Sequence, residues 1–140
     1  MHPLLRAPVL VAVLALGFLA SGCGGRREQA STFRVVERDF AIKAPRVVRA
    51  GLIHIVVKNR GPVAHELVLI RITGHELPVR TDGFTIDEDS VENRLLGAVE
   101  PQPAGIDGII DVRLKPGRYL LFCNMAGHFA AGMQKTFVVR

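Results

Sequence analysis

Short hydrophobic stretches separated by glycine and proline turns make up most of the chain after residue 32. Apolar and polar positions alternate in places, β-branched residues are frequent, and most of the region shows no strong amphipathic helix. Turn signals fall at Pro45, Gly51, residues 59–62 and residues 115–117. The pattern predicts strands at residues 33–42, 47–48, 52–57, 66–73, 106–114, 118–122 and 136–139. Short strands in this number indicate an all-β fold, an antiparallel sandwich or barrel.

A long connection at residues 74–105 interrupts this pattern. Three acidic residues at 87–89 precede Val91 and Leu95, which lie four positions apart, and Gly97 follows as a stop. Acidic residues in a first turn favour the positive end of a helix dipole. We therefore expect a short helix near residues 88–96 in a surface connection, because a connection of this length is uncommon in a compact domain. It does not indicate a second domain.

The N-terminal segment has the layout of an export signal. A short start with one basic residue, Arg6, precedes an unbroken apolar run at residues 9–20 and then small residues. The run is shorter than the roughly 20 residues that a membrane-spanning helix needs. Residues 19–23 resemble the lipobox of bacterial lipoproteins, in which cleavage leaves the cysteine as a lipid-bearing first residue. The alternative is a plain secreted protein in which Cys23 is unmodified.

These features predict three regions in an exported bacterial protein. Residues 1–22 form a secretory or lipoprotein signal, residues 23–32 a flexible tether, and residues 33–140 a single folded domain. Cys23 is the expected site of lipid attachment. The protein is expected in the periplasm or at the cell membrane, to which the lipid anchor holds it.

The composition excludes several function classes. With 49% hydrophobic residues the chain is not disordered, and two cysteines are too few for a disulfide-stapled scaffold. The net charge of +5 is spread along the chain, which differs from the basic stripe of a nucleic-acid-binding protein. If Cys23 carries lipid, Cys123 has no disulfide partner in an oxidising compartment. A single thiol in that setting suggests a chemical role.

Cys123, His128 and Met133 form the most informative pattern, with the spacing C-x4-H-x4-M between two predicted strands. A thiolate, an imidazole and a thioether are soft donors that select copper over hard cations, and zinc gains little from a thioether. Any one of these residues alone would be an ordinary buried side chain or an exposed polar one. Because a blue-copper site uses two histidines, one cysteine and a weak axial methionine, the pattern predicts one further histidine.

Three histidines could complete such a site. His54 lies inside an apolar strand and is expected to be structural or exposed, and His75 lies in a turn where it is expected to be solvated. His65 opens a predicted strand after the turn at residues 59–62, where it can meet a loop from the other end of the chain. We therefore select His65.

Three segments resemble the plastocyanin-like cupredoxins, which are type 1 blue copper proteins. These segments are N-x-G-x-x-x-H-E at residues 59–66, K-P-G-R-Y at residues 115–119, and the C-x4-H-x4-M loop with Gly132 before Met133. The loop spacing is similar to that of the auracyanin and rusticyanin branch. The resemblance implies a Greek-key antiparallel β-sandwich that holds one copper ion, as Cu(I) or Cu(II). It assigns His65 and His128 as imidazole ligands, Cys123 as the thiolate and Met133 as the axial thioether.

Glu66 departs from the family pattern, in which Asn or Ser often follows the first histidine ligand. A buried anion beside a thiolate is unfavourable. We therefore expect Glu66 to point to solvent or to pair with a cation.

The site predicts an electron carrier rather than an enzyme. Residues 122 and 124, the neighbours of Cys123, are not the histidines of copper oxidases, and one cysteine cannot bridge a binuclear centre. Four protein ligands leave no open position for a small-molecule substrate. The expected function is to pass single electrons between a donor and an acceptor protein in the periplasm or membrane.

The resemblance also implies that His128 reaches the surface through an apolar patch on which redox partners dock. The residues expected there are small or apolar, and weak contacts of that kind suit brief redox encounters. They are Met125, Ala126, Gly127, Phe129, Ala130 and Ala131. The alternative is that these residues only pack within the loop and have no docking role.

Two other functions remain open at this point. One is a periplasmic copper-binding or delivery protein without redox turnover. The other is a lipoprotein scaffold that retains the fold without using the metal.

Overall fold

A computed structural model describes residues 28–74 and 77–140, so the expected signal and Cys23 lie outside the described residues. Within these residues, no helix has the length and apolar character needed to cross a membrane. The described residues form nine strands and one 3-10 helix, η1. They are β1 (Ser31–Arg38), β2 (Ala41–Lys43), β3 (Val47–Val48), β4 (Gly51–Asn59), β5 (His65–Arg71), η1 (Asp89–Arg94), β6 (Leu95–Gln102), β7 (Asp107–Leu114), β8 (Gly117–Phe122) and β9 (Gln134–Val139).

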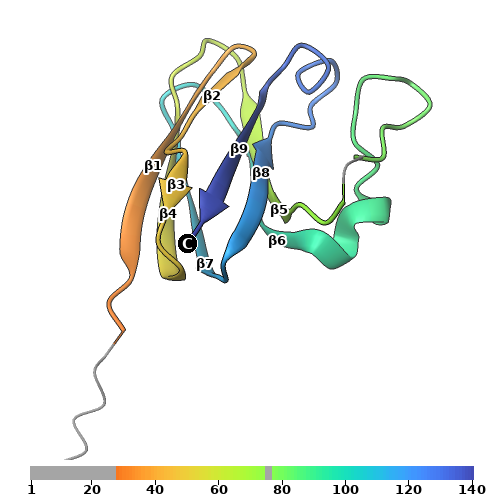
Figure 1. Cartoon of the computed structure of the whole chain (residues 1–140). Coiled ribbons are helices and arrows are strands. Elements are labelled where there is room, and N and C mark those ends of the chain that lie inside the picture. Colours follow the sequence, from red (N-terminus) through yellow and green to blue (C-terminus); the bar gives the residue numbers. More distant parts are fainter. Residues whose placement is uncertain (1–27, 75–76) are drawn as a thin grey trace, which may run out of the picture.

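The strands form two sheets that pack face to face (Figure 1). One sheet has the order β2-β1-β4-β7 and the other has the order β3-β9-β8-β5-β6. This arrangement confirms the predicted all-β sandwich. The pairing is not antiparallel throughout, because β1 runs parallel to β4 and β3 runs parallel to β9.

Alternating apolar residues fill the space between the sheets. In β4, Ile53, Ile55 and Val57 are fully buried, while the residues between them are partly exposed. They belong to the same core as Tyr119 and Phe137 of the facing sheet, whose rings stack with centroids 5.4 Å apart. Cys123 and Met133 belong to this core as well, so the ligand loop is held by the packing of the domain.

A second, smaller core lies on the outer side of the five-stranded sheet. Val68, Ile70, Leu120 and Phe122 of β5 and β8 are buried there, because the segment between β5 and β6 (residues 72–94) covers them with Ile86 and Val91. We call this covering stretch the β5–β6 segment. It includes η1, which confirms the short helix expected near residues 88–96.

Two strand predictions are wrong in detail. The strand expected at residues 33–42 is two antiparallel strands, β1 and β2, joined by a tight turn at Asp39 and Phe40. The connection at residues 74–105 contains strand β6, which pairs with β5 through two register shifts. Gly97 within β6 faces Ile110 so closely that an added Cβ would lie 2.6 Å from Ile110 Cγ2. The close approach explains the glycine at this position of the strand.

The two ends of the sandwich carry different features (Figure 1). The β1–β2 turn, the β4–β5 loop and the β8–β9 loop lie at the upper end in this view. The chain enters β1 at the lower end, where Glu28 accepts a hydrogen bond from the backbone of Leu52 and pairs with Arg113 at 2.6 Å. Strand β1 begins at Ser31, two residues before the domain boundary expected from the sequence.

Candidate metal centre

The structure brings together His65, Cys123 and His128 at the upper end of the sandwich. One donor atom from each lies within 4.8 Å of the other two. The Nδ1 atoms of His65 and His128 are 3.3 Å apart, and Cys123 Sγ is 3.3 Å from His128 Nδ1. Two donors bound at about 2 Å to one ion, with about 120° between them, need a separation of about 3.5 Å. The three donors therefore fit a single trigonally bound metal ion.

Asn59 fixes the loop that leads to His65. Its buried side-chain amide donates to the carbonyl oxygens of Val63 and Gln102, and its side-chain oxygen accepts the backbone N–H of Gly61. These three bonds close the β4–β5 loop and tie it to β6. The N-x-G part of the sequence motif therefore sets the position from which His65 begins β5.

The β8–β9 loop is closed by its own backbone. Cys123 N–H donates to the carbonyl oxygen of Met133, and Met133 N–H donates to the carbonyl oxygen of His128. Gly127 and Gly132 adopt φ values of 82° and 96°, which residues with a Cβ rarely adopt. Met133 is fully buried in the same core as Cys123, so the expected axial ligand is on the inner side of the loop.

Asp39 and Gly61 surround the far nitrogen of His65. Asp39 Oδ1 lies 3.2 Å from His65 Nε2, although the two atoms are not aligned for a hydrogen bond. A Cβ added at Gly61 would lie 2.8 Å from the same nitrogen, so the glycine leaves room for the ring. A carboxylate next to the second nitrogen of a ligating histidine orients the ring and increases its basicity. Asp39 could not be identified from the sequence, because its position beside His65 depends on the β1–β2 turn.

The protonation of the donors is set mainly by burial. Burial raises the pKa of the Cys123 thiol, while backbone N–H groups of Glu66 and Met125 donate to the sulfur and lower it in part. Burial and the neighbouring His128 lower the pKa of His65, and Asp39 opposes this change. Both shifts favour the uncharged forms of the metal-free donors, the Cys123 thiol and the neutral His65 imidazole. Metal binding here therefore displaces a proton from the sulfur.

Glu66 does not behave as expected from the sequence. Its side chain is half-buried and accepts the backbone N–H of Asn124, and no ion pair involves it among the described residues. Burial raises the pKa of its carboxyl group, and the Asn124 bond lowers it in part. Within the described residues, Glu66 therefore has neither the cation partner nor the full solvent exposure expected from the sequence.

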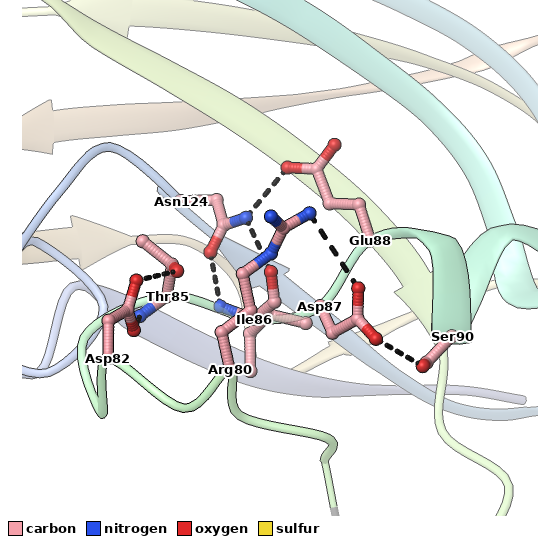
Figure 2. A network of polar contacts seen from close by, with 8 residues as sticks. All are labelled: Arg80, Asp82, Thr85, Ile86, Asp87, Glu88, Ser90 and Asn124. Atoms are coloured by element: carbon pink, nitrogen blue, oxygen red, sulfur yellow. Dashed lines mark hydrogen bonds and ion pairs between the residues drawn. The ribbon is translucent and has the colours of Figure 1, made fainter.

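Asn124 connects the ligand loop to the β5–β6 segment (Figure 2). Its side-chain amide donates to the carbonyl oxygen of Ile86 and to Glu88 Oε1, and its oxygen accepts the N–H of Ile86 at 2.6 Å. Further contacts within the segment, such as Arg80 with Asp87, surround this bridge. The residue after Cys123 is therefore anchored to an element that covers the outer face of the sheet.

The predicted docking residues are divided between the surface and the two cores. Ala126, Ala130 and Ala131 are exposed. Met125 packs against the core between the sheets, and Phe129 packs against the smaller core. Phe40, which the sequence reasoning missed, is 53% exposed, and its ring lies edge-on to His128 with centroids 5.6 Å apart. Its φ of 59° is unusual for a side chain of this size.

His54 lies apart from this group. His54 is on the outer face of β4, where its Nδ1 is 2.6 Å from Asp111 Oδ1 on β7. This agrees with the expectation of a structural or exposed side chain. His75 lies outside the described residues.

Comparisons with known proteins find the same fold. No protein-family model matches the chain, and no curated protein matches its sequence. Auracyanin from Roseiflexus castenholzii is 17% identical with a TM-score of 0.58, and the match covers 80% of this chain and 99% of that one. Auracyanin A from Chloroflexus aurantiacus, described as a "blue" copper protein, is 16% identical with a TM-score of 0.57, over 80% of this chain and 100% of that one. Rusticyanin from Thiobacillus ferrooxidans is 15% identical with a TM-score of 0.55, over 80% of this chain and 79% of that one.

The identities are low, so these comparisons establish the architecture, and the donor atoms have to be judged on their own geometry. Two imidazole nitrogens and one buried sulfur converge at separations suited to one metal ion. The chain has the cupredoxin β-sandwich fold, with a His–Cys–His group that fits a type 1 copper site.

Proposed function

We propose that this chain is a mononuclear type 1 copper protein that carries single electrons between redox proteins outside the cytoplasm. The observation that carries the proposal is the convergence of His65 Nδ1, His128 Nδ1 and Cys123 Sγ. Met133, buried on the inner side of the same loop, is the proposed axial thioether. Copper bound to this set supplies a one-electron couple between Cu(I) and Cu(II).

The protein's own residues keep the donor set in place. Asn59 fixes the loop before His65, and the backbone bonds of Cys123 and His128 to Met133 close the other loop. Ligands held in this way rearrange little between the two oxidation states, which favours rapid electron transfer. With Met133 as the fourth ligand, no position is open for a substrate, so we propose a carrier and not an enzyme.

Electrons are proposed to leave through His128. Its ring is half-buried beside exposed Ala126 and Ala130 and beside Phe40. Small uncharged residues of this kind form the low-area, weak contacts of redox encounters. A donor protein and an acceptor protein would use this same surface in turn.

The N-terminal sequence supports an exported lipoprotein, with Cys23 as the lipid-bearing residue. A direct test is the Cys23→Ser variant, expressed as the full chain in a bacterium. Loss of the protein from the membrane fraction, and of the acyl mass on the mature N-terminus, is expected. Unchanged membrane recovery with an unmodified Cys23 in the wild type would contradict lipidation.

Visible and electron paramagnetic resonance spectroscopy of the copper-loaded chain tests the main proposal. The Cu(II) form is expected to be intensely blue from sulfur-to-copper charge transfer, and Cys123→Ser is expected to lose that band. Cys23→Ser is the matched control, because it removes the other cysteine and should leave the band unchanged. A copper-loaded wild type without the band contradicts the proposal.

Repeated reduction and oxidation separate a carrier from a delivery protein. The carrier is expected to retain its copper through many cycles in the presence of a Cu(I)-binding competitor. Release of the metal to the competitor on each reduction would contradict the carrier function and would favour copper delivery.

A further inference from the structure

Six basic residues flank strand ends and a turn at the lower end of the sandwich, opposite the metal centre, where β5 and β9 end and β7 turns into β8 (Figure 1). We call this group the basic end. Five of its members are exposed and Arg71 is half-buried. The basic end consists of Arg46, Arg49, Arg71, Lys115, Arg118 and Arg140.

Backbone pairing holds these residues at one end even though they come from distant parts of the chain. Val138 N–H donates to the carbonyl oxygen of Arg46, and Ala50 N–H donates to that of Arg140. Arg71 Nη2 donates to the carbonyl oxygen of Pro116 in the turn that also contains Lys115. Arg118 lines one hollow of the surface with Arg46 and another with Arg71. The backbone pairing therefore holds the six residues at one end of the domain, and Arg118 shares surface hollows with Arg46 and Arg71.

Acidic partners for these cations are scarce in the part of the chain that the structure describes. None of the six takes part in an ion pair there, and Glu28, which lies at the same end, is already paired with Arg113. Asp39 and Glu66 lie at the metal-centre end instead, and five further acidic residues lie on the described part of the β5–β6 segment. The metal-centre end therefore carries both signs of charge, with Arg38, Lys43 and Arg60 among its cations, whereas the basic end carries cations with few acidic partners.

The chain also enters the domain at this end. Glu28 contacts Leu52 and Arg113, and β1 starts three residues later. The preceding 27 residues carry Arg26 and Arg27 and the apolar run at residues 9–20. A domain tied to a membrane through that segment would face the membrane with its basic end.

We propose that the basic end binds the anionic phospholipid headgroups of the membrane and thereby keeps the metal centre turned away from the bilayer. Anionic headgroups attract basic residues near the surface, by a factor of about five in binding for each Lys or Arg. The attraction decays within a Debye length of about 8 Å at physiological salt, so it selects the end that touches the lipid. The metal centre is left accessible to partners in the aqueous phase.

The test measures partition of the full chain into vesicles of phosphatidylglycerol and phosphatidylcholine, against vesicles of phosphatidylcholine alone. The N-terminal apolar segment meets both kinds of vesicle, so the ratio of the two partition coefficients reports the charge contribution. The wild type is expected to prefer the anionic vesicles, and 1 M salt should remove the preference. A wild type without this preference overturns the proposal.

A pair of triple variants locates the binding surface. Replacing Arg49, Lys115 and Arg118 with Ser is expected to reduce the preference roughly 100-fold. The matched control replaces Arg38, Lys43 and Arg60 with Ser, which removes the same charge from the metal-centre end and should keep most of the preference. Equal losses in both variants mean that net charge alone drives binding, and they overturn the proposal.

Two further measurements distinguish the loss of membrane binding from poor folding and from binding to an acidic protein. Lys115→Ser alone, on an exposed turn, is expected to lose about fivefold of the preference even if the triple variant folds poorly. Poly-L-glutamate serves as the acidic-protein probe. If the chain binds this probe but shows no preference for anionic vesicles, the basic end is a protein-docking surface and the membrane-binding proposal is rejected. None of these measurements needs copper, so their failure leaves the electron-carrier proposal intact.

Discussion

The side chain of Asn124 bonds to both backbone groups of Ile86, accepting the N–H at 2.6 Å and donating to the carbonyl oxygen at 2.9 Å. Asn124 follows Cys123 directly, and Ile86 is fully buried in the core on the outer side of the sheet. The bridge is therefore a short path from the metal centre to the β5–β6 segment. It orders two chain segments that are 38 residues apart.

Asn124→Ala is expected to remove the hydrogen bonds that form this bridge. Backbone groups of Ile86 lose their partners, so the free energy of unfolding should fall by about 1–3 kcal/mol. Amide hydrogen exchange at residues 86–88 should accelerate, and the copper charge-transfer band should shift because the loop at Cys123 loses an anchor. Ser90→Ala is the control, since Ser90 bonds to Asp87 within the same segment and not to the ligand loop. Unchanged exchange at Ile86 would show that the bridge does not hold the segment.

Gly61→Ala is expected to weaken copper binding. The new Cβ would lie 2.7 Å from Asp39 Oδ1 and 2.8 Å from His65 Nε2, so the imidazole has to move. Disturbing a ligand's supporting contacts lowers metal affinity by about 10–100-fold. Competition with a chromophoric chelator measures the affinity.

The matched control for this variant is Gly97→Ala. Its Cβ would be equally close to a side chain, at 2.6 Å from Ile110 Cγ2, but far along the sheet from the donor group. It should lower stability and leave the copper affinity unchanged. If both variants lose affinity equally, the effect is general destabilisation and Gly61 has no particular role at His65.

Phe40→Ala is expected to open His128 to small reagents. The Phe40 ring lies edge-on to the imidazole and is itself half-exposed, so it shields one side of the proposed electron exit. Oxidation of the Cu(I) form by ferricyanide, followed by stopped flow, should become faster while the reduction potential stays the same. Phe84→Ala is the control, because Phe84 is similarly exposed on the β5–β6 segment. An equal rate in wild type and Phe40→Ala would remove the shielding role.

Because of Glu37, the free energy of unfolding is expected to fall as the pH rises. Burial, with the nearby Glu66, raises the pKa of Glu37 from 4.5 to about 8. Between these values the unfolded chain releases a proton that the folded chain retains, so stability falls with rising pH by at most about 1.4 kcal/mol per pH unit. Below pH 4.5 and above pH 8 this contribution is constant.

Urea unfolding of the metal-free chain at pH 5, 6, 7, 8 and 9 measures this effect. The difference between wild type and Glu37→Gln isolates the Glu37 contribution from those of His65 and Glu66. Glu100→Gln, on an exposed position of β6, should follow the wild type. Parallel pH profiles for wild type and Glu37→Gln would mean that Glu37 is ionised in the folded chain.

Local patterns in the sequence predicted the sandwich because burial alternates along most strands, as in β4. The donor loop was also predictable, because Cys123, His128 and Met133 lie within one connection and their spacing can be read from the sequence. The β1–β2 turn was missed because Phe40 takes a conformation usual for glycine or asparagine. Strand β6 was missed because Gly97 and Pro101 interrupt its alternation.

Relationships across the fold were beyond a local reading of the sequence. The parallel pairing of β1 with β4 joins residues about 22 positions apart and leaves no pattern in either strand. The same holds for Asp39 beside His65 and for Phe40 beside His128, which meet only when the β1–β2 turn reaches the metal centre. Glu66 was misjudged because its acceptor role depends on the backbone of Asn124.

The smaller core on the outer side of the five-stranded sheet limits where residues can be inserted into the chain or deleted from it. Extra residues are tolerable at the tip near Asp82 and Gly83, where the chain is exposed and a local turn closes it. Shortening the β5–β6 segment past Ile86 would instead uncover Val68, Ile70, Leu120 and Phe122 together, and a contiguous apolar patch of that kind leads to self-association. Homologues that have lost this segment should therefore carry polar residues at these four positions or exist as oligomers.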